Sequence, residues 1–383
     1  MRGRCRAPSG RLWRVHVGYD DRYLAFLGRG PKEIPHWEHW SCPDAETYLT
    51  GIDYYEHPRL CRLKLFELYP RLRFSIMAAE EDTPIPRPTL GSNGRSSDPE
   101  HHTIRWGDGE SWTWRHGEIY FKTPEDVFAF SPLANPDFSN MPVVIAEDFS
   151  SEEIIYERYR RNFPAEWGET PPEGTGGSMW FYNTMFMWPL LTFGWELFLE
   201  CCMDKRFERV MDEFAEISRR VFRAFARLPI EFVISHDDIT TARGPVCSPS
   251  WMHKYIFPRY QEYWGTLNDA GKKVIFCADG RMDAYADDVI ACGARGIVTE
   301  PYTDFKAIAR RHEGEDLLLA GEGDNRVLTR NDPDEIEAMV KGMVETAKMT
   351  GGYMMCVGNQ IAWNVTPEGI KRYFECANKW AHR

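Results

Sequence analysis

Five apolar segments in the C-terminal half of this sequence each end in side chains that can bind a metal ion or transfer a proton. In chain order these side chains are His236, Asp237 and Asp238; Cys277 and Asp279; Glu300; Glu322 and Asp324; and Cys356 and Asn359. Thiolate and carboxylate ligands together suit zinc best. A carboxylate in a pocket can also acquire a raised pKa and act as an acid or base.

Each of these residues also has an ordinary structural interpretation. A cysteine at the end of an apolar run commonly packs as a small hydrophobic side chain. Asp279-Gly280 is typical of a turn, and Asp237 or Asp238 can cap a following turn. The functional interpretation depends on convergence, because five consecutive segments end in such groups.

The five segments have the pattern of buried β-strands. They are residues 230–238, 272–280, 294–301, 316–324 and 351–359. Continuous apolar runs of this length suit strands buried on both faces, as in a parallel sheet. Helical patterns lie before the first of them at 205–228 and between later ones at 282–292 and 333–348, and a last helix is predicted to begin at Thr366-Pro367.

Strands that alternate with helices predict an α/β architecture built from β-α-β units. Three further strands are predicted within residues 33–40, 71–76 and 178–187. The total then equals that of a closed (β/α)8 TIM barrel, in which functional groups lie at the carboxyl ends of the strands. A doubly wound open sheet is the alternative, but no GxGxxG motif follows an early strand.

Residues 80–150 interrupt the alternation and are predicted to be an insertion or lid over one end of the barrel. Residues 80–100 are rich in Pro, Gly and Ser, and residues 102–122 have the alternating pattern of a β-hairpin. The basic residues 1–15 are predicted to be a flexible tail, and 16–383 a single domain.

The composition argues against several classes of protein. The formal net charge of −12 gives little support to nucleic-acid binding. No apolar run approaches the roughly 18 residues of a membrane-spanning helix. The ten cysteines contain no CxxC pattern, which in a long chain predicts reduced thiols and a cytoplasmic location.

The order of motifs over about residues 180–383 resembles the uroporphyrinogen decarboxylase superfamily. The matching dipeptides after the first of the five segments are Asp237-Asp238, Gly244-Pro245 and Ser248-Pro249, followed by Pro258-Arg259-Tyr260. The sequence VIFCADG resembles the superfamily strand that ends in His-x-Cys-Gly or His-x-Asp-Gly, and YMMCVGNQIAWNVTPEGI resembles its last strand and helix. The resemblance implies a (β/α)8 barrel with the site at the strand ends, and a homodimer.

The superfamily contains two main chemistries. Its decarboxylases act on uroporphyrinogen without a cofactor. Its methyltransferases move a methyl group between a corrinoid, often on a partner protein, and a thiol or methylated substrate, and commonly bind zinc through the His-x-Cys pair and a late Cys. In this chain Cys277 holds the His position, Asp279 the Cys-or-Asp position and Asn359 the late position. The Arg-rich N-terminal signature of the decarboxylases is absent, which disfavours a substrate with as many carboxylates as uroporphyrinogen.

The resemblance therefore predicts a methyltransferase-like enzyme that acts on a small molecule with a corrinoid carried by a partner protein. The predicted zinc ligands are Cys277, Asp279 and Glu300. The predicted catalytic residues are His236, Asp237, Asp238, Asp279 and Asn359, and the predicted substrate-binding residues are Glu38, Trp195, Glu300, Glu322 and Asp324. Two alternatives stay open. One is a decarboxylase of uroporphyrinogen or a smaller carboxylate, without a cofactor; the other is a barrel that binds a small ligand without catalysis.

Overall fold

The structure is a computed structural model of the full chain. It describes residues 34–39, 42–69, 72–74, 82–87, 101–106, 109–114, 121–139, 147–161, 163, 178–181, 183–361 and 365–382. The predicted tail at residues 1–15 lies outside the described residues. No helix in the described ranges has both the length and the apolar composition needed to cross a membrane.

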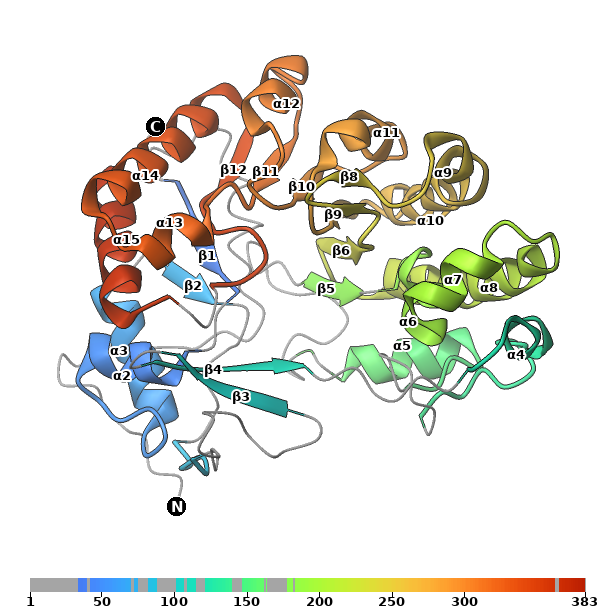
Figure 1. Cartoon of the computed structure of the whole chain (residues 1–383), viewed down its shortest axis with the longest axis horizontal. Helices are drawn as coiled ribbons and strands as arrows, with labels where there is room; N and C mark the ends of the chain where they lie inside the picture. The colour runs from blue at the N-terminus through green and yellow to red at the C-terminus, as the bar shows by residue number, and fades with distance from the viewer. Residues whose placement is uncertain are drawn as a thin grey trace.

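Parallel strands form the centre of the molecule, and each of the eight predicted strands is present (Figure 1). They are β1 (His36–Glu38), β2 (Leu72–Phe74), β5 (Ser178–Phe181), β6 (Phe232–His236), β9 (Lys273–Cys277), β10 (Gly296–Val298), β11 (Leu318–Ala320) and β12 (Gly352–Met354). Six of them pair in the order β12-β11-β10-β9-β6-β5, and β1 pairs with β2. A parallel bridge between His36 and Met355 joins β1 to the end of β12, which continues the ring and confirms the predicted (β/α)8 barrel.

The helices lie on the outer side of these strands (Figure 1). They are α2 (Pro43–Thr50), α3 (Pro58–Leu68), α4 (Pro124–Ala129), α5 (Glu152–Arg160), α6 (Met187–Phe193), α7 (Trp195–Cys201), α8 (Arg206–Arg227), α9 (Pro249–Tyr255), α10 (Phe257–Asp269), η2 (Met282–Ala284), α11 (Ala286–Ala291), α12 (Phe305–Arg311), α13 (Asn325–Arg330), α14 (Pro333–Met349) and α15 (Pro367–Trp380). The predicted cap of α14 is confirmed, because the Asp332 carboxylate accepts from the backbone N–H groups of Asp334 and Glu335.

Apolar side chains pack in two clusters that correspond to the two faces of the strands. The inner cluster contains Trp37, Phe232, Ile234, Ile275, Cys277, Val298, Leu318, Ala320, Met354 and Cys356. The larger outer cluster includes Val233 and Val274 together with side chains of the surrounding helices. Successive residues of a strand point to opposite faces, so each barrel strand contributes to both clusters. This alternation decides which residues at a strand end face the mouth of the barrel.

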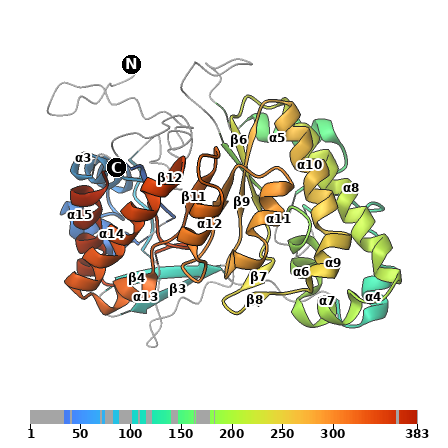
Figure 2. The ribbon, with the colours of Figure 1, turned by 90° about the horizontal axis from the view of Figure 1, so that it is seen from above.

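The region between β2 and β5 contains an antiparallel hairpin of β3 (His101–Trp106) and β4 (Gly109–Trp114). The hairpin predicted at 102–122 is therefore present, and residues 115–120 of that range lie outside the described residues. Figure 2 shows it at the same end of the barrel as the short β7 (Thr240–Thr241) and β8 (Gly244–Pro245), which follow the carboxyl end of β6. Its role as a lid stays a prediction.

Gly280 lies just after β9, where the backbone passes very close to that of Thr241. Its φ is +87°, and a Cβ placed there would lie 2.5 Å from the backbone carbon of Thr241. The next residue continues this contact, because the Arg281 N–H donates to the Thr241 carbonyl over 2.9 Å. A side chain at position 280 would therefore separate the two loops that carry Asp238 and Asp279.

We predict that Gly280→Ala destabilises the fold by at least about 2 kcal/mol, through backbone strain and the clash with Thr241. Gly342→Ala is the control, because Gly342 lies in α14 and a Cβ there meets nothing within 4 Å. The control is expected to gain about 0.5–1 kcal/mol from reduced entropy of the unfolded chain. Urea unfolding followed by circular dichroism measures both, and equal stability of the two variants would contradict the prediction.

Candidate active site

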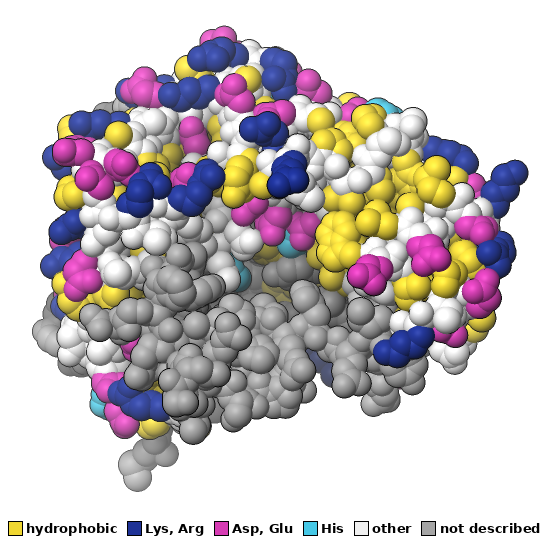
Figure 3. All heavy atoms as spheres, viewed as in Figure 1, with side chains coloured by type: hydrophobic (Ala, Val, Ile, Leu, Met, Phe, Trp, Pro, Cys, Tyr) yellow, Lys and Arg dark blue, Asp and Glu magenta, His cyan; other side chains and the backbone are white. Residues whose placement is uncertain are grey.

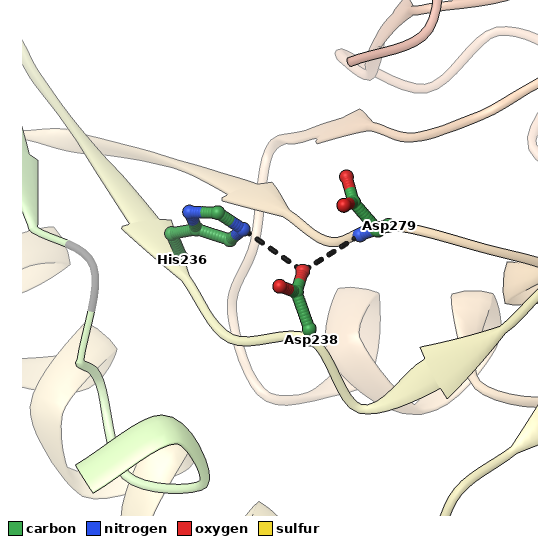
Figure 4. Close-up of side chains that lie close together, drawn as sticks. All are labelled: His236, Asp238 and Asp279. Atoms are coloured by element: carbon green, nitrogen blue, oxygen red, sulfur yellow. Dashed lines mark hydrogen bonds and ion pairs between the residues drawn. The ribbon is translucent and has the colours of Figure 1, made fainter. Parts of the chain in front are cut away.

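His236, Asp238 and Asp279 come together where β6 and β9 end (Figure 4). The Nε2 atom of His236 lies 2.9 Å from Oδ1 of Asp238, and the backbone N–H of Asp279 donates to the same oxygen over 2.9 Å. One potential ligand atom from each of the three residues lies within 4.8 Å of the others. We call these residues the His236–Asp238–Asp279 cluster. Strand alternation explains its composition, since His236 and Asp238 point inward while the residue between them points outward.

The three residues of the cluster differ in how readily they bind a proton. Burial raises the pKa of Asp279 to about 7, and the negative charges of Asp238 and Glu300 add to this effect. Burial also opposes ionisation of Asp238, but the hydrogen bond and charge of His236 outweigh it and hold the pKa of Asp238 below its ordinary value. Burial lowers the pKa of His236, but the hydrogen bond to Asp238 and the charges of Asp238, Asp279 and Asp237 together outweigh burial and raise it. Asp279 is therefore the group of this cluster that gains or loses a proton near neutral pH.

Two further strand ends contact the cluster. The side-chain amide of Asn359, beyond β12, donates to Oδ2 of Asp279 over 3.0 Å. Oε2 of Glu300, beyond β10, accepts from the backbone N–H of Gly280 over 2.7 Å. The structure thus brings together five predicted site residues, His236, Asp238, Asp279, Glu300 and Asn359, from four strands.

Aromatic side chains form the wall beside His236. Trp180 of β5 makes an edge contact with the His236 ring at 6.2 Å between centroids, and Trp37 of β1 stacks on Trp180 at 6.4 Å. The ring of His39 lies beyond Trp37 at 6.4 Å. Figure 3 shows a hollow at the centre of this face with acidic and histidine side chains along its edge. A substrate in the hollow would meet an apolar wall on one side and carboxylates on the other.

Asp237 faces the helices rather than the mouth. Its carboxylate is fully buried and accepts from the backbone N–H groups of Met185, Phe186 and Met187, at 2.7, 2.8 and 2.9 Å. The hydroxyl of Tyr260 donates to the same carboxylate over 2.6 Å. All four bonds fix the start of α6 and the position of α10, so the contacts of Asp237 are structural.

Two predicted substrate-binding carboxylates also point outward. Glu38 is fully buried and accepts from Tyr373 on α15 over 2.7 Å. Glu322 accepts from Tyr353 over 2.6 Å and from Thr346 on α14 over 2.8 Å. Each of these carboxylates fastens a helix or strand to the barrel rather than facing the mouth.

Asp324 and Trp195 lie at helix starts. Asp324 is the N-cap of α13, where its carboxylate accepts from the Arg326 N–H over 2.8 Å and pairs with the Arg326 guanidinium. Trp195 is the first residue of α7 and its side chain is 47% exposed. The structure does not bring either residue into the cluster.

The structure brings together a different group of potential metal ligands from the predicted zinc set of Cys277, Asp279 and Glu300. Among the described residues, the group able to place three ligand atoms within 4.8 Å is His236, Asp238 and Asp279, so only Asp279 of the predicted set remains. Cys277 belongs to the inner apolar cluster, paired in register with His236. Cys277 and Asp279 both face inward, but Cys277 lies two residues deeper on β9 and packs in the inner apolar cluster.

Arg326 is a residue at the mouth that the sequence did not indicate. Its guanidinium lies 4.7 Å from the centre of the Tyr302 ring and its charge lowers the pKa of Glu300, against the larger effect of burial. Arg326 lies inside the first turn of α13 and not at a strand end, so the pattern of polar residues at strand ends does not include it.

Known proteins resemble this chain in its C-terminal half. The sequence model of the uroporphyrinogen decarboxylase (URO-D) family matches residues 197–380, a range that contains the whole cluster together with Glu300 and Asn359. No curated protein matches the chain. Among solved structures, a xylose isomerase-like TIM barrel protein from Mycobacterium smegmatis, in complex with magnesium, shares 12% identity over 60% of this chain and 89% of that chain, with a TM-score of 0.23. That score is too low to support a conclusion. The family match, with the barrel topology and the order of motifs, supports membership of this chain in the uroporphyrinogen decarboxylase superfamily.

Proposed function

We propose that this superfamily enzyme is a methyltransferase-like member in which Asp279 transfers a proton and the His236–Asp238–Asp279 cluster binds a divalent cation such as zinc. The observation that carries the proposal is the raised pKa of Asp279, about 7, in a group of three potential ligands. A carboxyl group whose pKa is raised beside a histidine and other carboxylates is typical of a functional site.

The donor atoms fit a cation. One imidazole nitrogen and two carboxylates are ligand types that zinc accepts. Asp238, Asp279 and Glu300 repel one another, and this repulsion contributes to the raised pKa of Asp279. A divalent ion would neutralise the repulsion and take the place of the proton on Nε2 of His236. When bound, such an ion lowers the pKa of a thiol or water molecule that it holds.

The chain's own residues support a proton transfer at Asp279. Asn359 donates to one of its oxygens and fixes the orientation of the carboxyl group. Asp238 holds the backbone N–H of Asp279 and the ring of His236 at the same time. Asp279 in its ionised form would accept the proton that a thiol substrate loses when its sulfur takes a methyl group. The methyl donor would be a corrinoid on a partner protein, as the family resemblance implies.

The alternative reaction is decarboxylation, which needs a proton for the carbon that loses CO2. Asp279 in its protonated form is a suitable donor near neutral pH. The charges at the mouth favour a small substrate over uroporphyrinogen, because Asp238, Glu300 and Asp324 would repel a polyanion and Arg326 is paired with Asp324. The cytoplasmic location and the homodimer stay predictions from cysteine usage and from the family resemblance.

Asp279→Asn should change the stability of the fold in a pH-dependent way. The folded chain holds the Asp279 proton up to about pH 7, whereas an unfolded chain releases it near pH 3.8. The proton therefore stabilises the fold at low pH, and this contribution is lost as the pH rises from about 4 to 7. At 1.36 kcal/mol per pKa unit the loss reaches at most about 4 kcal/mol. The Asn variant avoids the loss, so its advantage over the natural chain should grow between pH 4 and 7 and then level off.

Thermal unfolding at half-unit pH steps measures this difference. Asp324→Asn is the control, since Asp324 lies at the same mouth but outside the cluster and caps α13. The control should show no growing advantage between pH 4 and 7. A constant difference between the natural chain and the Asp279→Asn variant across that range would show that Asp279 titrates normally.

Cation binding is tested by calorimetry with zinc chloride on the full chain after treatment with a chelator. We expect one zinc ion per chain at pH 7.5, and weaker binding at pH 6 because protons compete for His236 and Asp279. His236→Gln and Asp279→Asn should each weaken binding at least tenfold, whereas Asp324→Asn should not. Zinc binding that survives both cluster variants places the ion elsewhere in the chain, and no binding at all excludes the cation from the proposal.

The reaction itself is tested with free methylcobalamin and a small thiol, followed by the absorbance change of the corrinoid. The rate should rise as the pH approaches 7 and should fall about a hundredfold or more in Asp279→Asn. CO2 release from uroporphyrinogen or from small carboxylates is the parallel assay. Carbon dioxide release that depends on Asp279, without demethylation of the corrinoid, supports the decarboxylase instead. Turnover in neither assay supports a barrel that binds a ligand without catalysis.

A further inference from the structure

The loop that carries Asn359 determines how this side chain reaches Asp279. Asn359 is exposed and lies between β12 and α15. Its φ of +62° is in the left-handed region, which asparagine adopts more readily than most residues. An exposed side chain in a loop has a fixed direction only if the backbone on either side of it is held. The contacts of the neighbouring residues therefore decide whether Asn359 can orient Asp279.

Asn325 holds the backbone on both sides of Asn359. Its side-chain amide donates to the carbonyl of Gln360 over 2.7 Å and to the carbonyl of Gly358 over 3.4 Å. One NH2 group has two N–H bonds, so a single asparagine can bind both carbonyls. Asn325 itself is placed by α13, because it is the first residue of this helix and follows the N-cap Asp324.

The start of the same loop packs closely against the end of β10. A Cβ at Gly358 would lie 2.8 Å from the Cα atom of Glu300. The Gly358 N–H also donates to the carbonyl of Gly323 over 2.9 Å. Backbone contacts therefore fix the loop at Gly358, whereas the Gln360 carbonyl at its other end is held by the side chain of Asn325.

We propose that Asn325 is a positioning residue of the active site, which acts on Asp279 through Asn359. The Asn325 amide holds the backbone around Asn359, and the Asn359 amide donates to Oδ2 of Asp279 over 3.0 Å. Without the two donors of Asn325 the loop can turn, and Asn359 no longer keeps the Asp279 carboxyl group in one orientation. The assignment rests on the proposed function only in that Asp279 is the group that transfers a proton.

The orientation of Asp279 matters because a carboxyl group exchanges a proton through one of its two oxygens. Oδ2 already accepts from Asn359, so a substrate would exchange its proton with Oδ1. Rotation of the carboxyl group would move Oδ1 away from the substrate. A displacement of 1 Å from the productive geometry can cost about a hundredfold in rate.

Urea unfolding of the full chain at pH 7.5 tests whether Asn325 and Asp279 are coupled. We expect Asn325→Ala to raise the unfolding constant at least about threefold more in the natural chain than in the Asp279→Ala chain, because the latter offers no carboxyl group to the Asn359 amide. This difference should disappear in the Asn359→Gly chain, since glycine adopts the positive φ but has no amide side chain. A purely structural Asn325 would show no coupling to Asp279.

The matched control is Asn268→Ala. The Asn268 amide donates to the carbonyl of Gly293 over 3.1 Å, which is the same kind of bond, but Asn268 lies in α10, before the amino end of β9. Its effect on the unfolding constant should be equal in the natural and Asp279→Ala chains. The proposal is overturned if Asn325→Ala also has equal effects in these two chains, or if its coupling to Asp279 survives Asn359→Gly.

The natural chain provides a measurement that needs no variant to fold. The side-chain amide protons of Asn325, followed by NMR, should exchange with solvent at least about tenfold more slowly than those of free asparagine, because both are hydrogen-bonded. Exchange as fast as in free asparagine shows that the amide does not hold the loop in solution, and overturns the proposal.

The rate of methyl transfer from methylcobalamin to a small thiol gives the last test. Asn325→Ala should lower kcat about tenfold and leave KM nearly unchanged, because the variant misplaces the group that transfers the proton. Adding Asn359→Gly should lower kcat no further, since both changes act on the same contact. A loss in KM alone, or losses that multiply, overturns the proposal. If the natural chain shows no turnover, the proposed function fails, and the unfolding experiment still decides the role of Asn325.

Discussion

One oxygen atom, Oδ1 of Asp238, links the end of β6 to the end of β9. It accepts from the ring of His236 and from the backbone of Asp279, both over 2.9 Å. The ionised Asp238 favours the charged form of His236 and the neutral form of Asp279. The unequal protonation of the cluster therefore follows from the position of a single carboxylate, and Asn359 and Glu300 add to an arrangement that Asp238 has already fixed.

The carboxylates at the strand ends divide into two classes. Those that face inward build the cluster. Those that face outward each accept a hydrogen bond of 2.6–2.7 Å from a buried tyrosine hydroxyl: Asp237 from Tyr260, Glu38 from Tyr373 and Glu322 from Tyr353. A buried carboxylate without such partners would cost several kcal/mol. The tyrosine hydroxyl satisfies this carboxylate while the tyrosine ring fills the space between sheet and helix. Carboxylates therefore form the cluster on the inner face of the barrel and hold the helices in place on its outer face.

The sequence predicted the barrel well because apolar runs buried on both faces differ from amphipathic helices. The predicted helix at 333–348 became α14, Pro333–Met349, and each predicted strand segment contains a barrel strand. It also predicted that several strand ends would meet, since the carboxyl ends of parallel strands share one end of the barrel. Asp238, Asp279 and Asn359 were found in this way.

The role of each predicted site residue depends on the direction in which its side chain points, and the sequence does not show that direction. Asp237 and Asp238 are neighbours of one type, yet strand alternation sends them to opposite faces, and the partners of Asp237 lie about fifty residues earlier in the chain. Glu322 follows Gly321, whose φ of +100° turns the backbone where it passes the carbonyl of Thr299. Cys277 faces inward like Asp279, but it packs in the inner apolar cluster, which the sequence does not show.

Different strands of the barrel carry the groups that transfer protons and the aromatic wall that a substrate would contact. The cluster, Glu300 and Asn359 come from β6 and the segments that follow it in the chain, whereas the aromatic wall beside His236 comes from β1 and β5. Substitutions of Trp37 or Trp180 can alter the shape offered to a substrate without replacing a residue that transfers protons. Selection for a new substrate can therefore act on the N-terminal half while the proton chemistry is inherited unchanged. The residues that the family model matches, 197–380, include the cluster but neither β1 nor β5.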